Sequence, residues 1–204
     1  MSVFSAVKIK TYNSLNNPIS LFQKWFDEES AISEANIPSA VCLSTLGLDG
    51  FPNARFVSLK EIKENTFIVT GPLKSRKGLE IAADNKVALT FWWTGTERQI
   101  RIQGEASSIS EALADKYFKA RNIHSKAVSV ISEQGQLTED LPALERKMLE
   151  KVAENQPIPR PKSWGGFAIK PHRMEFMEFK DTRFHHRKCF LLENEEWVSH
   201  QLQP

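Results

Sequence analysis

Apolar side chains recur along this chain with two different periods, and each change of period marks an expected element. After the turn signal Asn16-Asn17-Pro18, apolar positions return every three or four residues, which predicts a helix over residues 19–35. Later segments alternate residue by residue, as strands with one buried face do. The alternation is clearest where Ile100 and Ile102 are separated by Arg101.

Short strands dominate the rest of the pattern, and turn residues separate most of them. Strands are expected at residues 40–46, 53–62, 66–70, 87–93, 99–109, 167–179, 189–193 and 197–201. Further helices are expected at 75–83, opened by Ser75, at 110–121, capped by Ser110, and at 140–155. Hairpin-connected strands with helices between them predict a mainly β (α+β) fold, an antiparallel barrel with peripheral helices.

Length, charge and cysteine content narrow the function classes. The 204 residues suit one domain spanning residues 1–204, and the net charge of only +2 argues against a general nucleic-acid binder. No apolar run reaches the ~18 residues of a membrane span, and residues 1–10 lack a secretory signal core. Cys42 and Cys189 follow no metal-ligand spacing, which predicts reduced thiols in a cytoplasmic protein without a metal site.

Two cationic clusters in the first half of the chain are candidates for anion binding. Arg55 and Lys60 lie in one expected strand and would face opposite sides unless a bulge intervenes, so they indicate either two anionic groups or two surface charges. Arg76 and Lys77 open a helix, where cations oppose the helix dipole. A phosphate bound at that N-terminus would remove the conflict, and an uncorrected surface penalty is the alternative.

Three further features could complete a site. Tyr117 and Arg121 share one helix face and Ser125 follows the expected helix end, so they form either a second phosphate site or an ordinary exposed helix end. Gln99 could hydrogen-bond a heterocycle or be structural. The segment 183–187 holds two arginines and two histidines, which is either a ligand site or a solvated turn. Together these clusters suggest two phosphorylated, flat ligands, and a cofactor would have to supply the chemistry.

The order and spacing of these segments resemble the pyridoxamine 5′-phosphate oxidase family, from about Pro18 to Pro204. The resemblance rests on the order and spacing of short segments, which are Arg55 to Lys60, Ser75 to Gly78, Arg98 to Ile102, Tyr117-Phe118, Arg121, Ser125, Trp164 to Phe167, Glu175-Phe176 and Arg183 to Arg187. It implies a six- to eight-stranded split β-barrel with a C-terminal family region at 164–204, FMN as the cofactor, and a cytoplasmic homodimer with the FMN site at the subunit interface.

The resemblance also implies residue roles. FMN would contact Arg55, Phe56, Val57, Ser58, Leu59, Lys60, Val69, Thr70, Arg76, Lys77, Gln99, Gln134, Gly135, Met177 and Arg187. The substrate, a phosphorylated B6 vitamer, would contact Lys60, Tyr117, Arg121, Ser125, Arg183 and His185. Arg183 and His185 would lie at the reacting ring, where a hydride equivalent passes to the flavin and O2 then gives peroxide.

Several positions depart from the family pattern. His186 replaces an acid, Met177 a flavin-contacting tryptophan, Gly135 a serine and Asn122 a proline. The expected function is oxidation of pyridoxamine or pyridoxine 5′-phosphate to pyridoxal 5′-phosphate. The alternatives are an FMN oxidase acting on another ring, such as the phenazine-pathway oxidases, and a non-catalytic protein that binds FMN or pyridoxal phosphate.

Overall fold

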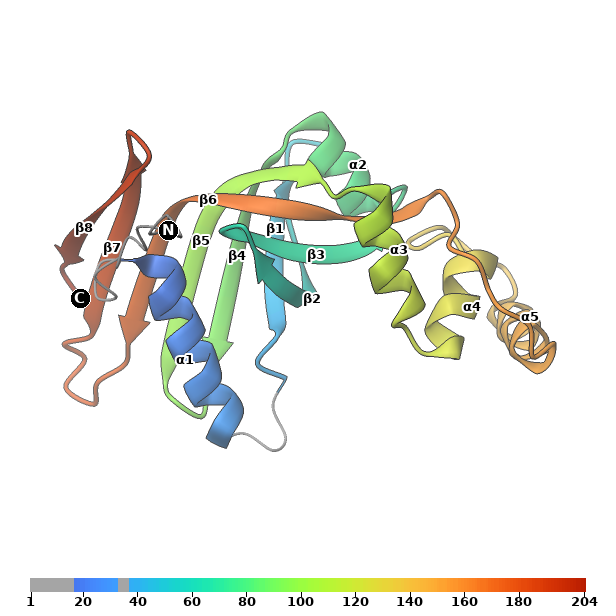
Figure 1. Ribbon diagram of the computed structural model, residues 1–204, viewed down its shortest axis with the longest axis horizontal. Helices are drawn as coiled ribbons and strands as arrows, with labels where there is room; N and C mark the ends of the chain where they lie inside the picture. Colours follow the sequence, from blue (N-terminus) through green and yellow to red (C-terminus); the bar gives the residue numbers. More distant parts are fainter. Residues whose placement is uncertain (1–16, 33–36) are drawn as a thin grey trace, which may run out of the picture.

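Six antiparallel strands close into a barrel at the centre of the computed structural model, which describes residues 17–32 and 37–204 (Figure 1). The strands follow the order β3-β2-β1-β4-β5-β6, and β3 pairs again with β6 to close the ring. Their bounds are β1 Ala40–Leu46, β2 Pro52–Lys63, β3 Thr66–Pro72, β4 Lys86–Trp93, β5 Arg98–Ser108 and β6 Trp164–Glu178. Two more strands, β7 His186–Glu193 and β8 Glu196–Leu202, extend the sheet from β6. The expected antiparallel split barrel is therefore confirmed.

Helices cover the barrel on different sides. Their bounds are α1 Pro18–Ile32, α2 Arg76–Ala83, α3 Glu111–Lys119, α4 Ile123–Ile131 and α5 Leu141–Ala153. In Figure 1, α3, α4 and α5 lie at the end of the molecule away from β7 and β8. The buried side chains of Phe22 and Trp25 pack α1 against the barrel core. This burial of aromatic surface is the main force that holds α1 in place.

The barrel interior is filled by side chains that alternate inward along each strand. Leu43, Leu89 and Ile100 are fully buried, and the ring of Phe22 lies 5.0 Å from the rings of Phe67 and Phe91. The interior is thus a packed core without room for a ligand. A ligand site is therefore expected on the outer surface of the barrel.

Most expected elements are confirmed, with ends displaced by a few residues. The N-terminal helix is described as far as Ile32, and the expected residues 33–35 lie outside the described residues. Ser110 caps α3, because its hydroxyl accepts a hydrogen bond from the Leu113 N–H at 3.3 Å. Helix α4, whose N-cap is Asn122, is an element that the sequence pattern did not predict. Ser125 therefore lies in the first turn of a further helix rather than beyond a helix end.

Strand β2 carries both cations of the first expected cluster and has a bulge at Lys60. Leu59 pairs with Val69 and Glu61 with Ile68, so Lys60 has no partner in the ladder. An extra residue in one strand shifts the following side chains and bends the strand. Burial alternates up to this point, so Arg55 and Lys60 lie on opposite faces of β2, yet both line one cavity. The candidate site therefore takes side chains from both faces of β2.

Candidate functional site

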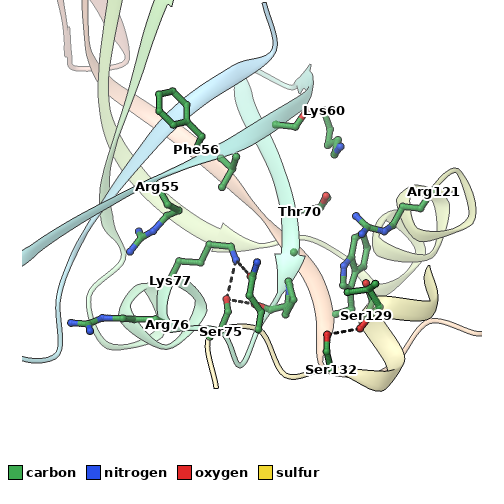
Figure 2. Close-up of a pocket in the computed structure, with 18 residues that line it drawn as sticks. Arg55, Phe56, Lys60, Thr70, Ser75, Arg76, Lys77, Arg121, Ser129 and Ser132 are labelled. Carbon is green, nitrogen blue, oxygen red and sulfur yellow. Dashed lines mark hydrogen bonds between the residues drawn. The ribbon is translucent and has the colours of Figure 1, made fainter. Parts of the chain in front are cut away.

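A cavity of about 590 Å³ lies between the barrel wall and helices α2 and α4 (Figure 2). Strands β2 and β3 form one wall, and the segment after α4 forms another. Its lining residues are Arg55, Phe56, Val57, Ser58, Lys60, Thr70, Gly71, Pro72, Ser75, Arg76, Lys77, Arg121, Val128, Ser129, Ser132, Gln134, Gly135 and Trp164. In Figure 2, Arg55, Arg76 and Lys77 lie on one side of this cavity, and Lys60 and Arg121 lie on the other. Two separate cationic groups therefore share one cavity.

The first cationic group is organised by the buried carboxylate of Glu80 on α2. Its Oε2 accepts hydrogen bonds from Thr45 Oγ1 at 2.5 Å and Arg55 Nη2 at 2.9 Å. Its Oε1 accepts from Asn53 Nδ2 at 2.5 Å and Arg76 Nε at 2.9 Å. Burial alone would raise the pKa of Glu80, but these hydrogen bonds hold it below its usual value. Glu80 therefore stays charged and fixes both guanidinium groups at the cavity wall.

Lys77 differs from these arginines because it has no carboxylate partner among the described residues. Its Nζ donates to Ser75 Oγ at 3.0 Å and to Gln134 Oε1 at 2.6 Å, which links α2 to the segment after α4. Burial, and then the charge of Arg55, lower the pKa of Lys77 to about 8. A cation destabilised in this way gains strongly from a bound anion. The site is thus suited to a phosphate on this side of the cavity.

The second cationic group consists of Lys60 and Arg121. Burial and the nearby charge of Arg121 lower the pKa of Lys60, and burial lowers the pKa of Arg121. Neither cation pairs with a carboxylate anywhere in residues 17–32 and 37–204. Two cations that repel each other across a partly buried wall indicate a second anion-binding position.

Unpartnered polar atoms concentrate in the same cavity. Four buried side-chain atoms of the described chain lack a hydrogen-bond partner, and three belong to lining residues, namely Thr70 Oγ1, Arg121 Nε and Trp164 Nε1. Buried polar atoms in folded proteins are nearly always paired. Their clustering here indicates that a polar ligand supplies the missing partners.

Tyr117 does not take the place expected for it. Its hydroxyl donates a short hydrogen bond to Glu61 Oε1, and Lys116 lies 3.5 Å from the same oxygen. The hydrogen bond from Tyr117 holds the pKa of Glu61 low, whereas burial and then Glu61 raise the pKa of Tyr117 far above its usual value. Arg121 does meet Ser125, because Nη2 donates to the Ser125 carbonyl at 3.2 Å. Of these three residues only Arg121 lines the cavity, and its contact with Ser125 is to the backbone carbonyl rather than to the hydroxyl.

Gln99, Met177 and Arg187 form a second group outside the cavity. Gln99 pairs with Met177 across β5 and β6, and Met177 pairs with Arg187 across β6 and β7. The Arg187 guanidinium donates to Glu175 Oε1 at 2.5 Å and 3.1 Å. Burial raises the pKa of Glu175, but Arg187 and its other arginine neighbours lower it overall. The three residues thus share one face of the sheet, away from the cavity of the same chain.

Arg183 and His185 lie together in the loop between β6 and β7. This loop forms a small hollow of about 280 Å³ with Phe179 and Glu97. His185 Nδ1 accepts a hydrogen bond from the Lys180 N–H at 3.0 Å, and its ring lies 4.9 Å from Phe179. Arg183 has a positive φ of 64°, a conformation that costs energy for a residue with a side chain. The loop thus holds both expected catalytic side chains apart from the cavity of the same chain.

The remaining assignments divide between the cavity and the core. Phe56, Val57, Ser58, Gln134 and Gly135 line the cavity, whereas Leu59 and Val69 point into the barrel core at 7% and 3% exposure. Sequence reasoning missed Glu80 and gave Trp164 no role. The spacing of four from Arg76 to Glu80 was an available signal for an ion pair on α2. Nothing in the sequence pattern pointed to the unpartnered indole of Trp164.

The described residues contain neither a cluster suited to a metal ion nor a helix suited to a membrane. No group of three or more His, Cys, Asp or Glu side chains in residues 17–32 and 37–204 has a metal-binding arrangement. Within the same residues, no helix has the length and apolar character needed to cross a membrane.

Comparison with known proteins gives concordant matches along most of the chain. The family model described as pyridoxamine 5′-phosphate oxidase matches residues 30–156, and that of the pyridoxine 5′-phosphate oxidase C-terminal dimerisation region matches residues 164–204. The chain is 38% identical to the pyridoxine/pyridoxamine 5′-phosphate oxidase of Acaryochloris marina, over 92% of this chain and 86% of the relative. For the enzyme of the same name from Trichormus variabilis, identity is 36%, over 100% of this chain and 94% of the relative.

Two solved structures are also similar. PhzG from Burkholderia lata, in complex with tetrahydrophenazine-1-carboxylic acid, superposes with a TM-score of 0.89 at 28% identity, over 98% of this chain and 100% of its own. A pyridoxamine 5′-phosphate oxidase-related, FMN-binding protein from Nostoc punctiforme has a TM-score of 0.73 at 13% identity, over 95% of this chain and 99% of its own. The second likeness bears on the fold alone.

Proposed function

The chain belongs to the pyridoxamine 5′-phosphate oxidase family, an FMN-dependent oxidoreductase family, and on that premise we propose that it oxidises pyridoxamine or pyridoxine 5′-phosphate to pyridoxal 5′-phosphate. One observation carries this proposal. A single cavity holds two cationic groups on opposite sides and three unpartnered buried polar atoms. That arrangement fits two phosphorylated ligands bound next to each other.

The first cationic group fits the phosphate of FMN. Lys77 has a lowered pKa and lacks a carboxylate partner in the described chain, and the Arg55 guanidinium is held beside it by Glu80. The hydroxyl of Thr70 is unpartnered in the same cavity and could bond a polar edge of the flavin. FMN, when bound, supplies the two-electron acceptor that O2 later reoxidises with formation of peroxide. The protein's contribution is to orient the rings and exclude water.

The second cationic group fits the phosphate of the substrate. Lys60 and Arg121 supply two positive charges without a carboxylate partner in the described chain, and the Nε–H of Arg121 is free to donate. Fixing a phosphate there would hold the reacting carbon of the ring at a constant distance from the flavin. Tyr117 would join this set only after releasing Glu61, to which it now donates.

We further propose that the enzyme is a homodimer in which each site takes residues from both subunits. Gln99, Met177, Arg187, Arg183 and His185 lie outside the cavity of their own chain, so a second copy would have to bring them to the ligands. The matched C-terminal family region is described as a dimerisation region. The exposed rings of Phe56 and Trp92, at 77% and 52%, offer apolar surface for such a contact.

Complementation between subunits tests this arrangement. Lys77→Met and Arg183→Gln should each inactivate the enzyme alone. When the two variants are co-expressed, mixed dimers contain one site with both residues intact, so activity should return. Absence of recovery from dimers shown to be mixed would contradict the shared site.

The direct test of the proposed reaction uses purified protein loaded with FMN. It should form pyridoxal 5′-phosphate and peroxide from pyridoxamine or pyridoxine 5′-phosphate. Failure with both substrates would refute the proposal. The free thiols Cys42 and Cys189 are consistent with the cytoplasmic location that we propose for this reaction.

A second candidate function is oxidation of another ring, and the similarity to PhzG is the observation in its favour. The hydrogen bond from Tyr117 to Glu61 also takes the Tyr117 hydroxyl away from a substrate phosphate. Arg121→Ala separates the two functions. It should raise KM strongly for a phosphorylated substrate and leave KM unchanged for a substrate without phosphate. A protein that binds FMN, but whose flavin does not bleach anaerobically with either substrate, would instead be a non-catalytic binder. The departures from the family pattern at Met177, Gly135 and His186 motivate this alternative.

A further inference from the structure

Trp164 has no role in the set of expected site residues, yet its environment is that of a ligand-binding residue. The side chain is 1% exposed, lines the cavity, and has no partner for its indole N–H among the described residues. A buried tryptophan N–H normally finds an acceptor, because leaving it unpaired costs free energy. In the same chain the buried Trp93 follows this rule, since its Nε1 donates to the Pro38 carbonyl at 3.0 Å.

The indole of Trp164 is held in place without any ligand. Its backbone N–H donates to the Pro161 carbonyl at 2.9 Å, and its carbonyl accepts from Arg160 Nη1 at 2.6 Å. Arg160 is itself bound by Glu111 and Asp115 on α3. The indole packs edge-on against Phe118, with ring centroids 5.1 Å apart. The Trp164 side chain is therefore fixed at the cavity wall, with its indole N–H unpaired.

A second unpartnered donor lies next to this indole. The guanidinium carbon of Arg121 is 5.1 Å from the Trp164 ring centroid, a cation–π distance, and Arg121 Nε is buried without a partner. The charge of Arg121 also reaches Lys60, which it perturbs electrostatically. Two N–H donors and two positive charges thus converge on one part of the cavity without a carboxylate from the described chain. An oxyanion is the ligand chemistry that fits this set.

We propose that the Trp164 indole N–H donates a hydrogen bond to a phosphate oxygen of the bound substrate, with Arg121 Nε as the second donor. Trp164 is thereby a binding residue that also orients the Arg121 guanidinium by stacking beneath it. This inference rests on the proposed function for the identity of the phosphorylated ligand. The convergence of donors is independent of that identity.

Trp164→Phe tests the proposal, because phenylalanine keeps an aromatic ring and removes the N–H. Trp93→Phe is the matched control, since it makes the same exchange at a buried tryptophan outside the cavity. We would titrate FMN-saturated protein with pyridoxal 5′-phosphate and, separately, with inorganic phosphate, and follow binding by calorimetry. Trp164→Phe should raise the Kd of pyridoxal 5′-phosphate and of inorganic phosphate about tenfold each, as expected for the loss of one hydrogen bond to a charged acceptor. It should leave FMN affinity unchanged. Trp93→Phe should lower Tm but leave both ligand affinities intact.

A second measurement covers the case in which Trp164→Phe does not fold. The five tryptophans give five indole N–H signals in an NMR spectrum of ¹⁵N-labelled protein, and phenylalanine variants of the other four assign Trp164 by elimination. Inorganic phosphate should shift the Trp164 signal downfield and leave that of Trp93 in place. Unchanged phosphate affinity in Trp164→Phe, or an unmoved Trp164 signal at saturating phosphate, would overturn the proposal. Wild-type protein that binds inorganic phosphate through Trp164 but ignores pyridoxal 5′-phosphate would refute the proposed function and leave this inference standing.

Discussion

Replacing Glu80 with glutamine should destabilise the protein and weaken FMN binding together. The carboxylate is fully buried and accepts four hydrogen bonds, from Thr45, Asn53, Arg55 and Arg76. An amide of the same shape has one acceptor oxygen, and its NH2 group would face two of these donors. Breaking a buried ion pair by removing one partner costs about 3–5 kcal/mol. Because the amide keeps one acceptor, we expect a loss of about 3 kcal/mol in the free energy of unfolding.

For a chain of this size, that loss corresponds to a fall in Tm of roughly 6–12 °C. Thermal and urea unfolding, followed by circular dichroism, would measure it. Asp49→Asn is the matched control, because Asp49 is half-exposed and pairs with the same Arg76 at 2.6 Å. Removal of that surface pair should hardly change Tm. FMN affinity should fall in Glu80→Gln, since Arg55 loses its anchor, and stay constant in Asp49→Asn.

Acid pH adds an independent check on Glu80. Its pKa in the folded protein lies below the value of 4.5 for a free side chain, so its contribution to stability is present above that pH. The contribution is lost as pH falls through the lowered pKa. The difference in stability between wild type and Glu80→Gln should therefore shrink as the pH drops below about 4. Equal Tm shifts for Glu80→Gln and Asp49→Asn at neutral pH would refute this reasoning.

Three further predictions follow from the geometry of the cavity and its surroundings. Glu61→Gln should tighten binding of a phosphorylated substrate about tenfold, because a negative charge is removed and the amide oxygen holds the Tyr117 hydroxyl less strongly than the carboxylate does. Glu64→Gln on the same hairpin should have no such effect, and equal affinities of Glu61→Gln and wild type by calorimetry would contradict a phosphate-binding Tyr117. FMN affinity, followed by fluorescence quenching, should fall as pH rises through about 8, where Lys77 loses its proton, while the stability of the free protein rises between about 8 and 10.5. Lys77→Arg should flatten the dependence of FMN affinity on pH, because arginine stays charged. An identical pH dependence in that variant would refute the assignment. Met177→Trp should lower the Kd for FMN about fivefold, because a stacked ring contributes about 1 kcal/mol. An equal fall in Kd for Met148→Trp on α5 would show that the gain in FMN affinity does not come from position 177.

The strands were predictable because each carries a strong local signal. Alternation over Ile100 to Glu105 and the Gly50 turn, whose φ is +83°, identify β5 and the β1–β2 hairpin without tertiary information. Helix α4 was not predicted because its serines are weak helix formers, and its N-cap residue Asn122 was too weak a signal by itself to mark the start of a new helix. Local periodicity is therefore enough for the barrel but not for the short helix that closes the cavity.

The candidate site was only partly predictable, because its decisive contacts join distant parts of the chain. The cations were visible in the sequence, and Arg55, Lys60, Lys77 and Arg121 do meet in one cavity. Their organisation was not visible, since Glu80 lies 25 residues from Arg55 and 35 from Thr45 in sequence. Likewise, no local pattern indicates that Glu61 captures Tyr117 across 56 residues.

The bulge at Lys60 has a consequence for protein engineering. Leu59 pairs with Val69 and Glu61 with Ile68, so deleting residue 60 alone would leave an uninterrupted ladder between β2 and β3. Such a shortened protein would lose an irregularity and a partly desolvated cation at once, and it should tolerate higher temperatures than its parent. It would also be an inert scaffold, because one side of the cavity would keep only Arg121. The chain thus keeps one extra residue in β2, whose side chain lines the cavity, where a more regular ladder would need none.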